Sequence, residues 1–411
     1  MNHFDLEKHS FQSKLSVGLL ALFTVTVFFV GVTEFMLSSM FPPIAKAFNT
    51  SIDKVSFLIS AYALSYALAA PVLGYFSDRI NKVKLLLLAL LLFSMDGIAI
   101  AFSPTIEIAI FLRVLGGLAS AVIIPTVFSL VSDLVPYKNQ ASAMGGVMLG
   151  MTLGIALGPV LAGSLNDFIH WRAPFIFCAI GSFIIFSVGY FYLKKIKNRN
   201  YNTFPLKKKS LKEDINWSVL RPLFAKGAWN GAGVSAFILS GEILHQRYGF
   251  PPSITGLSVS FFGFGLGLGN ISAGLLRKLI AKEEGILIAI NIILFIFISI
   301  FFLFPLPLWG YFLCLVAWGC ALGAGAPIST VVIIKRITHY KTVMLSLAET
   351  LNNIFIFSLV PLSIMFLSNG NRYLSLVVLG IGLIIGLLLT IFDFLIIRKN
   401  TSHHIIKNDD Y

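Results

Sequence analysis

Charged residues are scarce in this chain: they make up 12% of its 411 residues, against roughly 25% in an average soluble domain. Hydrophobic residues account for 57%, phenylalanine alone contributes 38 residues, and the mean hydropathy is +0.88. A soluble chain of this length would form two or three domains, each needing a polar surface that this composition does not supply. The composition therefore excludes soluble globular, disordered, collagenous and disulfide-stapled proteins, and it indicates a polytopic membrane protein.

Residues for metal, redox and nucleotide chemistry are also few. The three cysteines, Cys178, Cys314 and Cys320, lie in apolar runs without a CxxC pair, which predicts small buried side chains. The seven histidines lie in the tails, in loops or at the ends of apolar runs, and the sequence has no Walker A segment. We therefore expect a protein that is not an enzyme, binds no cofactor or metal, and does not use ATP.

Apolar runs long enough to cross a bilayer, about 20 residues each, recur twelve times. They predict an all-α membrane protein, because lipid offers the backbone no hydrogen-bond partners. The first run is too long for a signal peptide. The predicted spans are 15–44, 54–76, 84–103, 107–132, 141–165, 172–193, 220–245, 253–276, 285–304, 308–334, 341–367 and 373–397.

The longest polar stretch, 194–219, divides the predicted spans into two sets of six. We therefore predict an N-terminal six-helix half at 1–193, a basic cytoplasmic linker at 194–219, a C-terminal six-helix half at 220–397 and a cytoplasmic tail at 398–411. Two such halves are expected to be pseudo-symmetric.

The net charge of +13 follows the predicted topology. Of the 31 Lys and Arg residues, 23 lie on the side of the termini and 5 on the opposite side. This asymmetry predicts that both termini and the linker are cytoplasmic. The linker has no foldable nucleic-acid-binding module, so we expect no nucleic-acid binding and favour contact with anionic membrane lipids.

The loop after the second span carries Gly74, Asp78, Arg79, Asn81 and Lys82. Glycine permits a tight exit from a helix, and Asn81 tolerates a left-handed turn. The aspartate suits an ion pair or a helix N-terminus, and the basic residues hold the loop in the cytoplasm.

Two further segments combine glycine with charge or proline. The fourth span carries Arg113 followed by Gly116 and Gly117. In the fifth span, glycines four residues apart form a flat face for close helix packing, and a proline breaks the hydrogen-bond ladder. The residues of this fifth-span pattern are Gly150, Gly154, Gly158, Pro159 and Gly163.

With these segments, the chain resembles major facilitator superfamily transporters, and it is most similar to the twelve-span bacterial drug:proton antiporters. The family's loop motif is matched by Gly74, Asp78, Arg79 and Lys82, with Asn81 in place of the second glycine and Phe76 in place of leucine. Its fourth-span motif is matched by Arg113 and Gly117, with Gly116 in place of glutamine. Its fifth-span antiporter motif is matched by Gly154, Gly158, Pro159 and Gly163, with Ala162 in place of a glycine. Gly31-Val32-Thr33-Glu34-Phe35 is similar to a first-span segment of sugar-, nucleoside- and chloramphenicol-efflux members.

The resemblance implies export by exchange, with the loop motif latching the halves on the cytoplasmic side and the fifth span sealing the pathway. It also implies a protein of the inner (cytoplasmic) membrane of a bacterium, which works as a monomer with a small-molecule substrate and protons. The second half contains a partial match to the loop motif at Gly269–Lys278, without an acid at the position equivalent to Asp78.

Ionisable residues within the spans are costly to insert, at roughly 2.5–3.5 kcal/mol each, so each is a candidate functional group. Glu34 lies about 15 Å and Arg113 about 9 Å from the outer ends of their spans, at 1.5 Å per residue. We therefore expect the two to meet across a central cavity. Our hypothesis is that Glu34 carries the exchanged proton and also meets cationic substrate, and the alternative is a permanent structural pair with Arg113.

The other intramembrane groups rank lower. Glu349 with Asn352 and Asn353 in the eleventh span is either a polar patch for substrate or an interhelical hydrogen-bond site. Glu242 is expected to be an interfacial or gating group, and Asp96 a neutral or paired structural acid. Arg221 and Lys226 are expected to extend to the cytoplasmic face.

The sequence predicts a proton-coupled exporter of small amphipathic or hydrophobic molecules, a multidrug efflux antiporter working by alternating access. A dedicated exporter of one sugar, nucleoside, amino acid or siderophore is the alternative. An uptake symporter is disfavoured by the fifth-span pattern. A membrane-bound enzyme would need a catalytic cluster that we do not find, and a lipid flippase would need a lateral opening that the sequence does not reveal.

Overall fold

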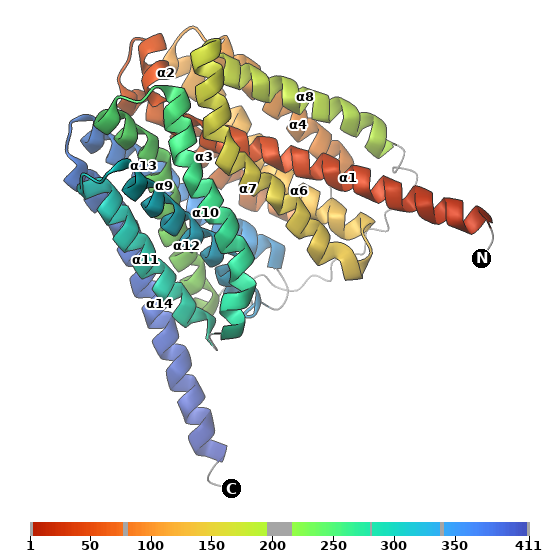
Figure 1. The fold of residues 1–411 in the computed structure, drawn as a ribbon. Coiled ribbons are helices and arrows are strands. Elements are labelled where there is room, and N and C mark those ends of the chain that lie inside the picture. The colour runs from red at the N-terminus through yellow and green to blue at the C-terminus, as the bar shows by residue number, and fades with distance from the viewer. Residues whose placement is uncertain (1–2, 77–80, 195–215, 280–281, 338–340, 409–411) are drawn as a thin grey trace. The chain divides into compact units, whose positions relative to one another are not determined.

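The computed structural model describes residues 3–76, 81–194, 216–279, 282–337 and 341–408, and every element within these ranges is a helix (Figure 1). The helices that precede the linker are α1 (His3–Phe35), η1 (Met36–Ser39), α2 (Phe41–Ala47), α3 (Ile52–Phe76), α4 (Lys82–Ala101), α5 (Ile106–Leu112), α6 (Val114–Leu134), α7 (Tyr137–Phe168) and α8 (Ala173–Lys194). Those that follow are α9 (Trp217–Tyr248), α10 (Pro252–Leu279), α11 (Glu283–Leu303), α12 (Leu308–Ile334), α13 (Lys341–Ser368) and α14 (Arg372–Asn408).

Eleven of the described helical segments are long and apolar enough to cross a membrane. Each corresponds to one of the predicted spans. The remaining predicted span, 220–245, forms α9, whose 32 residues include Arg221, Lys226 and Glu242. These charges lower the hydropathy of α9, although most of its side chains are buried. The predicted all-α membrane fold is confirmed.

Two predicted single helices are interrupted. The first span ends as α1 at Phe35, continues as the short 3-10 helix η1, and resumes as α2 around two consecutive prolines, Pro42 and Pro43. A proline has no N–H for the helical ladder, so this break has a local cause. The fourth span is divided into α5 and α6 at Arg113, which lies at the junction.

The chain forms two compact units, Met1–Pro205 with Tyr248–Ser260, and Leu206–Arg247 with Phe261–Tyr411. The predicted halves placed the whole of 220–397 together, whereas residues 248–260, which include the start of α10, group with the first unit. The predicted boundary at 194–219 stays a prediction, because residues 195–215 lie outside the described ranges.

The first unit is built around two sets of helix contacts. α1 lies side by side with α7 (Figure 1), while α4 packs against α6 and α8, and α3 packs against α6. In the second unit α11 lies beside α12 and α14, and α13 packs against α14. Small residues bring α9 into this group: a Cβ on Gly325 of α12 or Gly386 of α14 would collide with the Trp229 side chain.

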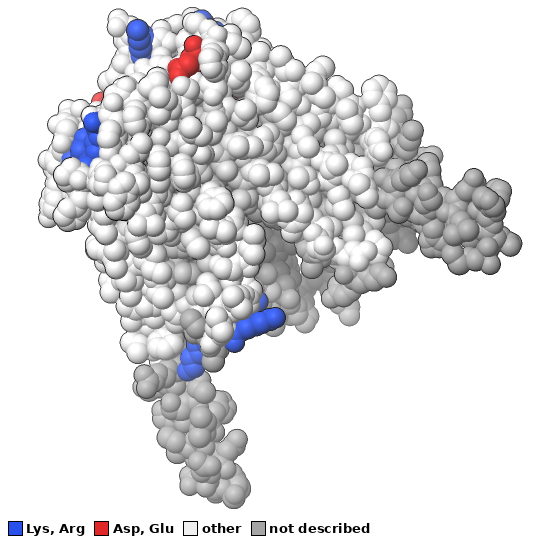
Figure 2. Space-filling model, in the orientation of Figure 1, with Lys and Arg blue, Asp and Glu red and all other residues white. Residues whose placement is uncertain are grey.

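Many large hydrophobic side chains of the helices are exposed at the surface. Leu68, Phe111 and Ile271 are examples of large hydrophobic side chains with most of their surface exposed. The face drawn in Figure 2 is almost entirely uncharged in the described part of the chain, with its few coloured side chains near helix ends. Such a surface is suited to contact with lipid tails.

Candidate functional site

A buried ion pair occupies the first unit. Nη1 of Arg113 lies 2.7 Å from Oδ2 of Asp96, and both side chains are 1% exposed. Nη2 of Arg113 donates to the backbone carbonyl of Thr33 at 2.8 Å. The guanidinium therefore joins α4, which carries Asp96, to α1 and to the α5–α6 junction. Pairing and hydrogen bonding of this kind are what a charge inside a membrane span requires.

The sequence makes room for this pair at Gly116. A Cβ built on Gly116 would lie 2.6 Å from Oδ2 of Asp96, so the carboxylate occupies space that any other residue at 116 would take. Gly97, the neighbour of Asp96, allows α4 to approach α8 in the same way, with a Cβ 2.6 Å from the carbonyl of Phe175. Gly116 stands where the family motif has glutamine. In this chain the glycine leaves room for an acid on the adjacent helix.

Tyr62 of α3 completes the surroundings of Arg113. The centre of its ring lies 4.7 Å from the guanidinium carbon, within the range of a cation–π contact. Its hydroxyl donates to the Ser120 hydroxyl of α6 at 2.5 Å. We did not single out Tyr62 from the sequence. An aromatic residue within an apolar span gives no signal of this role.

The structure corrects the expected partner of Arg113. We expected the guanidinium to pair with Glu34, and it instead pairs with Asp96, the acid expected only to be neutral or structurally paired. The physical reason is local. Asp96 and Arg113 are 17 residues apart on consecutive helices, and Gly116 admits the carboxylate. The argument for Glu34 was its similar depth in the membrane, and depth does not fix the direction in which a side chain points.

Glu34 remains in the neighbourhood of this pair. It directly follows Thr33, whose carbonyl accepts from Arg113, and it is partly exposed near the end of α1. The backbone next to Glu34 therefore contacts Arg113, and Glu34 itself is partly exposed.

The glycines of the fifth span pack α7 directly onto the backbone of α1. A Cβ on Gly150 would lie 2.1 Å from the carbonyl oxygen of Thr24, and one on Gly154 would lie 2.3 Å from that of Phe28. On α1, a Cβ on Gly31 would lie 2.8 Å from the carbonyl oxygen of Met151. Backbone contact this close leaves no room for a side chain, as in other small-residue interfaces between membrane helices.

The end of the same motif is also placed within the first unit. The carbonyl of Pro159 accepts a hydrogen bond of 2.9 Å from the hydroxyl of Ser39 in η1. A Cβ on Gly158 would touch Val32 at 3.1 Å, and one on Gly163 would lie 2.1 Å from the carbonyl oxygen of Pro252 in the part of α10 that belongs to this unit.

Part of the loop motif is described. Gly74 lies in the last turn of α3, and Lys82 forms a salt bridge of 2.7 Å with Asp133 at the end of α6. Asn81 is not in the left-handed conformation that we expected. Its φ of −61° and ψ of 109° are extended, and its side chain caps α4 by accepting from the N–H of Lys84. Asp78 and Arg79 lie outside the described residues.

A second polar site lies in the second unit, between α9, α12 and α13. Nζ of Lys226 lies 3.2 Å from Oε1 of Glu349 and 3.3 Å from the Thr330 hydroxyl. One turn along α9, Nδ2 of Asn230 donates to Oδ1 of Asn352 at 2.8 Å. The predicted patch on α13 is therefore matched by a lysine and an asparagine on α9. Asn230 was not identified from the sequence.

Lys226 and Arg221 do not extend to the cytoplasmic face as expected. Both are buried, and Nε of Arg221 lies 3.2 Å from Oδ1 of Asp393 in α14. The carboxylates of Glu349 and Asp393 are close enough to hold the two cations inside, which is why they do not extend. Glu242, expected at an interface, is also buried in α9 and accepts from the amide of Gln246 at 2.9 Å.

Arg336, which lies just after α12, is the centre of a larger cluster of charged side chains. Its guanidinium bonds both oxygens of Asp393, at 2.9 and 2.7 Å, and Oε1 of Glu284 at 2.9 Å, and it donates to the carbonyl of Ser218. Burial lowers the pKa of Arg336, but the hydrogen bonds and charges of Asp393 and Glu284 outweigh it and raise the pKa above its ordinary value. The cluster thus ties α9, α11, α12 and α14 together.

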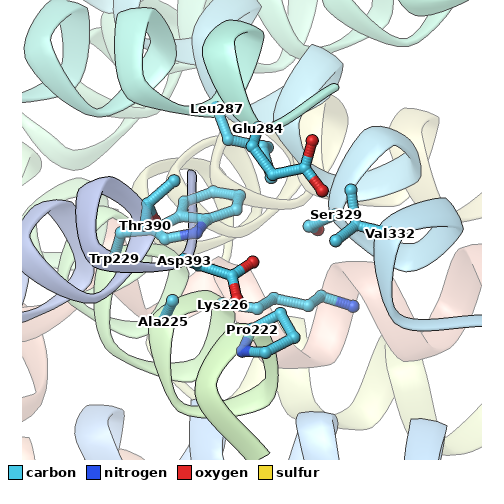
Figure 3. A pocket seen from close by; sticks show the side chains of 10 residues that line it. All are labelled: Pro222, Ala225, Lys226, Trp229, Glu284, Leu287, Ser329, Val332, Thr390 and Asp393. Atoms are coloured by element: carbon cyan, nitrogen blue, oxygen red, sulfur yellow. The ribbon is translucent and has the colours of Figure 1, made fainter. Parts of the chain in front are cut away.

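A small pocket lies beside this cluster (Figure 3). Lys226, Glu284 and Asp393 line it together with Ser329, and Trp229 lies on one side. Within the described residues, no three His, Cys, Asp or Glu side chains are placed to hold a metal ion. The charged side chains of this region are instead arranged in ion pairs.

The membrane spans, the buried ion pairs and the helix interface of backbone contacts are those of an integral membrane protein. The family model of the Major Facilitator Superfamily matches residues 23–360. The chain therefore belongs to the Major Facilitator Superfamily, whose members are transporters rather than enzymes.

Known relatives include drug-resistance proteins. The chain is 27% identical over 215 residues to "Multidrug resistance protein 2" of Bacillus subtilis (strain 168), covering 52% of this chain and 53% of that protein. It is 24% identical over 226 residues to "Quinolone resistance protein NorA" of Staphylococcus aureus, covering 55% and 56%. The alignments thus span about half the length of each relative.

Solved structures share the fold along nearly the whole chain. A bacterial homologue of the human lysosomal transporter Spinster, in an inward-facing and unoccupied conformation, matches with a TM-score of 0.70. The match is 17% identical in sequence and covers 93% of this chain and 98% of that chain.

Proposed function

We propose that this transporter is a proton-coupled exporter of small amphipathic or hydrophobic molecules in a bacterial cell membrane. One observation carries the proposal: Glu34 is partly exposed and directly follows Thr33, whose carbonyl accepts a hydrogen bond from the buried Arg113 that Asp96 already pairs. Because Asp96 neutralises the guanidinium, Glu34 can gain and lose a proton without leaving Arg113 unpaired.

The other site residues support the same function. The backbone contacts of Gly154 and Gly158 with α1 place the fifth-span motif next to the segment that carries Glu34. We propose that this interface, Pro159 and Gly163, and the loop motif of Gly74, Asp78, Arg79 and Lys82 form the gating elements of alternating access. The drug-resistance relatives favour export of drug-like molecules.

The proposal includes a topology and an assembly. The excess of Lys and Arg on one side favours a cytoplasmic position for both termini. The protein is proposed to act as a monomer, with a small-molecule substrate, protons and the surrounding lipids as its partners.

Glu34→Gln is expected to reduce substrate-driven proton movement to the level of vesicles without the protein, because an amide does not take part in proton exchange. The measurement uses everted membrane vesicles with an imposed pH gradient, and a panel of drugs and metabolites is added one at a time. In wild-type vesicles, a transported compound should collapse the gradient and so identify itself.

The matched control is Glu107→Gln, which removes an exposed acid paired at 3.4 Å with Lys54 near the start of the same span as Arg113. This variant should transport like the wild type. Wild-type gradient collapse by Glu34→Gln would refute the carrier role, and substrate entry only in right-side-out cells would refute export. The Asn230–Asn352 amide pair favours one second candidate, a dedicated exporter of a polar metabolite, which the panel distinguishes by its response to a single compound.

A further inference from the structure

The ion pair in the second unit has two unequal members. Nζ of Lys226 contacts Oε1 of Glu349 at 3.2 Å, but the lysine side chain is 6% exposed and the glutamate side chain is 42% exposed. A molecule approaching this pair therefore meets the carboxylate first. An ionisable group exposed within a membrane span faces the bundle interior or a hydrated cavity rather than lipid.

The site is already shaped for an ammonium group. Lys226 supplies one, and it has the acceptors that an ammonium requires: a carboxylate oxygen from Glu349 and the hydroxyl of Thr330 at 3.3 Å. Both distances are longer than the roughly 2.7–2.9 Å of a strong charge-assisted hydrogen bond. The ammonium of a ligand is not attached to α9, so it can approach more closely and make shorter hydrogen bonds to the same carboxylate.

The ammonium of Lys226 also has an alternative environment. The pocket beside it is lined by the carboxylates of Glu284 and Asp393 and by the hydroxyl of Ser329 (Figure 3). A carboxylate offers about four acceptor positions, so Asp393 can accept from a lysine in addition to Arg336 and Arg221. Displacement from Glu349 thus does not force Lys226 to remain buried without a counter-charge.

From these three observations we propose that Glu349 is a binding site for organic amines, in which Lys226 is a tethered ammonium that the ligand displaces. Asn230 and Asn352 supply further polar atoms one turn away. The ligand class is a protonated primary or secondary amine on an apolar body. Lys226 thereby acts as an internal competitor that sets the affinity, and it returns to Glu349 when the ligand leaves.

The test measures binding of dansylcadaverine, an amphipathic primary amine, to the purified full-length protein by fluorescence. The neutral N-acetyl derivative of the same probe reports binding that does not depend on charge. Lys226→Gln is expected to tighten binding of the amine on the order of tenfold. The glutamine no longer competes for the carboxylate of Glu349, and tenfold corresponds to the free energy of one charge-assisted hydrogen bond. Glu349→Gln is expected to weaken amine binding by a similar factor and to leave the N-acetyl probe unchanged.

Lys335→Gln is the matched control, because it removes a lysine from another ion pair of the second unit, with Glu283, at the end of α12. It should leave amine binding at the wild-type value. Unchanged or weaker amine binding by Lys226→Gln would refute the displacement, as would equal tightening in Lys335→Gln. If Lys226→Gln does not fold, Glu349→Gln still decides, since a retained preference for the amine over its N-acetyl derivative would refute the site.

The physiological meaning of this ligand class rests on the proposed export function, but the binding measurement does not. It uses no membrane and no proton gradient. A protein that binds the amine without moving protons would contradict antiport and leave the Glu349 site intact. A protein that moves protons with other substrates and shows no amine preference would contradict the site alone.

Discussion

Asp96→Asn is expected to lower the free energy of unfolding by about 3–5 kcal/mol, the usual cost of leaving one member of a buried ion pair without its partner. The Arg113 guanidinium is 1% exposed, so water does not replace the lost carboxylate. The carbonyl of Thr33 and the ring of Tyr62 would be its remaining partners. Tryptophan fluorescence during unfolding in mixed detergent micelles measures the change.

The double variant Asp96→Leu with Arg113→Met separates charge from packing. Replacing a whole buried ion pair by apolar side chains of similar volume is often neutral or stabilising, by about 1–4 kcal/mol. The double variant should therefore unfold at or above the stability of the wild type, while Asp96→Asn alone does not. A loss below about 1 kcal/mol in Asp96→Asn would mean that the pair behaves like an exposed salt bridge, and would contradict its burial.

Gly154→Ala is expected to destabilise the protein by about 1–3 kcal/mol, the range for overpacking a close contact, and to reduce transport. The new Cβ would lie 2.3 Å from the carbonyl oxygen of Phe28 and 2.9 Å from Cα of Gly31. Both are backbone atoms, so α1 and α7 must separate to relieve the collision. Unfolding in mixed micelles and gradient collapse in everted vesicles measure the two effects.

Gly146→Ala is the matched control on the same helix, because a Cβ at Gly146 would have nothing within 4 Å. Alanine in a helix is favoured over glycine by about 0.5–1 kcal/mol, so this variant should be as stable as the wild type or slightly more stable. If Gly154→Ala behaves like Gly146→Ala, the close packing of α1 on α7 is not required.

Most spans were predicted within a few residues because a bilayer imposes a minimum length on every apolar run, whereas α1 begins well before and α14 ends well after the predicted bounds. The predicted span 308–334 has the bounds of α12, and 341–367 differs from α13 by one residue. The breaks at Phe35 and Arg113 were not predicted, since hydropathy averaged over about 20 residues conceals the end of one helix inside a continuous apolar run.

The candidate site was predicted less completely. The charged residues were found because a charge in an apolar run stands out, and the glycine spacing of α7 indicated a packing face. Their partners were not found, because pairing depends on the rotation of each helix about its axis. Asp96 rather than Glu34 pairs with Arg113. Likewise Lys226 turns to Glu349 instead of the cytoplasmic face. Tyr62 and Asn230 gave no sequence signal at all.

The charges of α9 affect how this helix inserts into the membrane during synthesis. Arg221, Lys226 and Glu242 together lower the tendency of this helix to leave the translocation channel for lipid, at roughly 2.5–3.5 kcal/mol each on insertion scales. The acids that neutralise Arg221 and Lys226, Asp393 and Glu349, are synthesised more than a hundred residues later. We therefore expect α9 to insert stably only after α13 and α14 have been synthesised. Reporter fusions ending after Tyr248 should show mixed topology, and fusions ending after Asn408 a single one; a single topology in both would contradict late insertion.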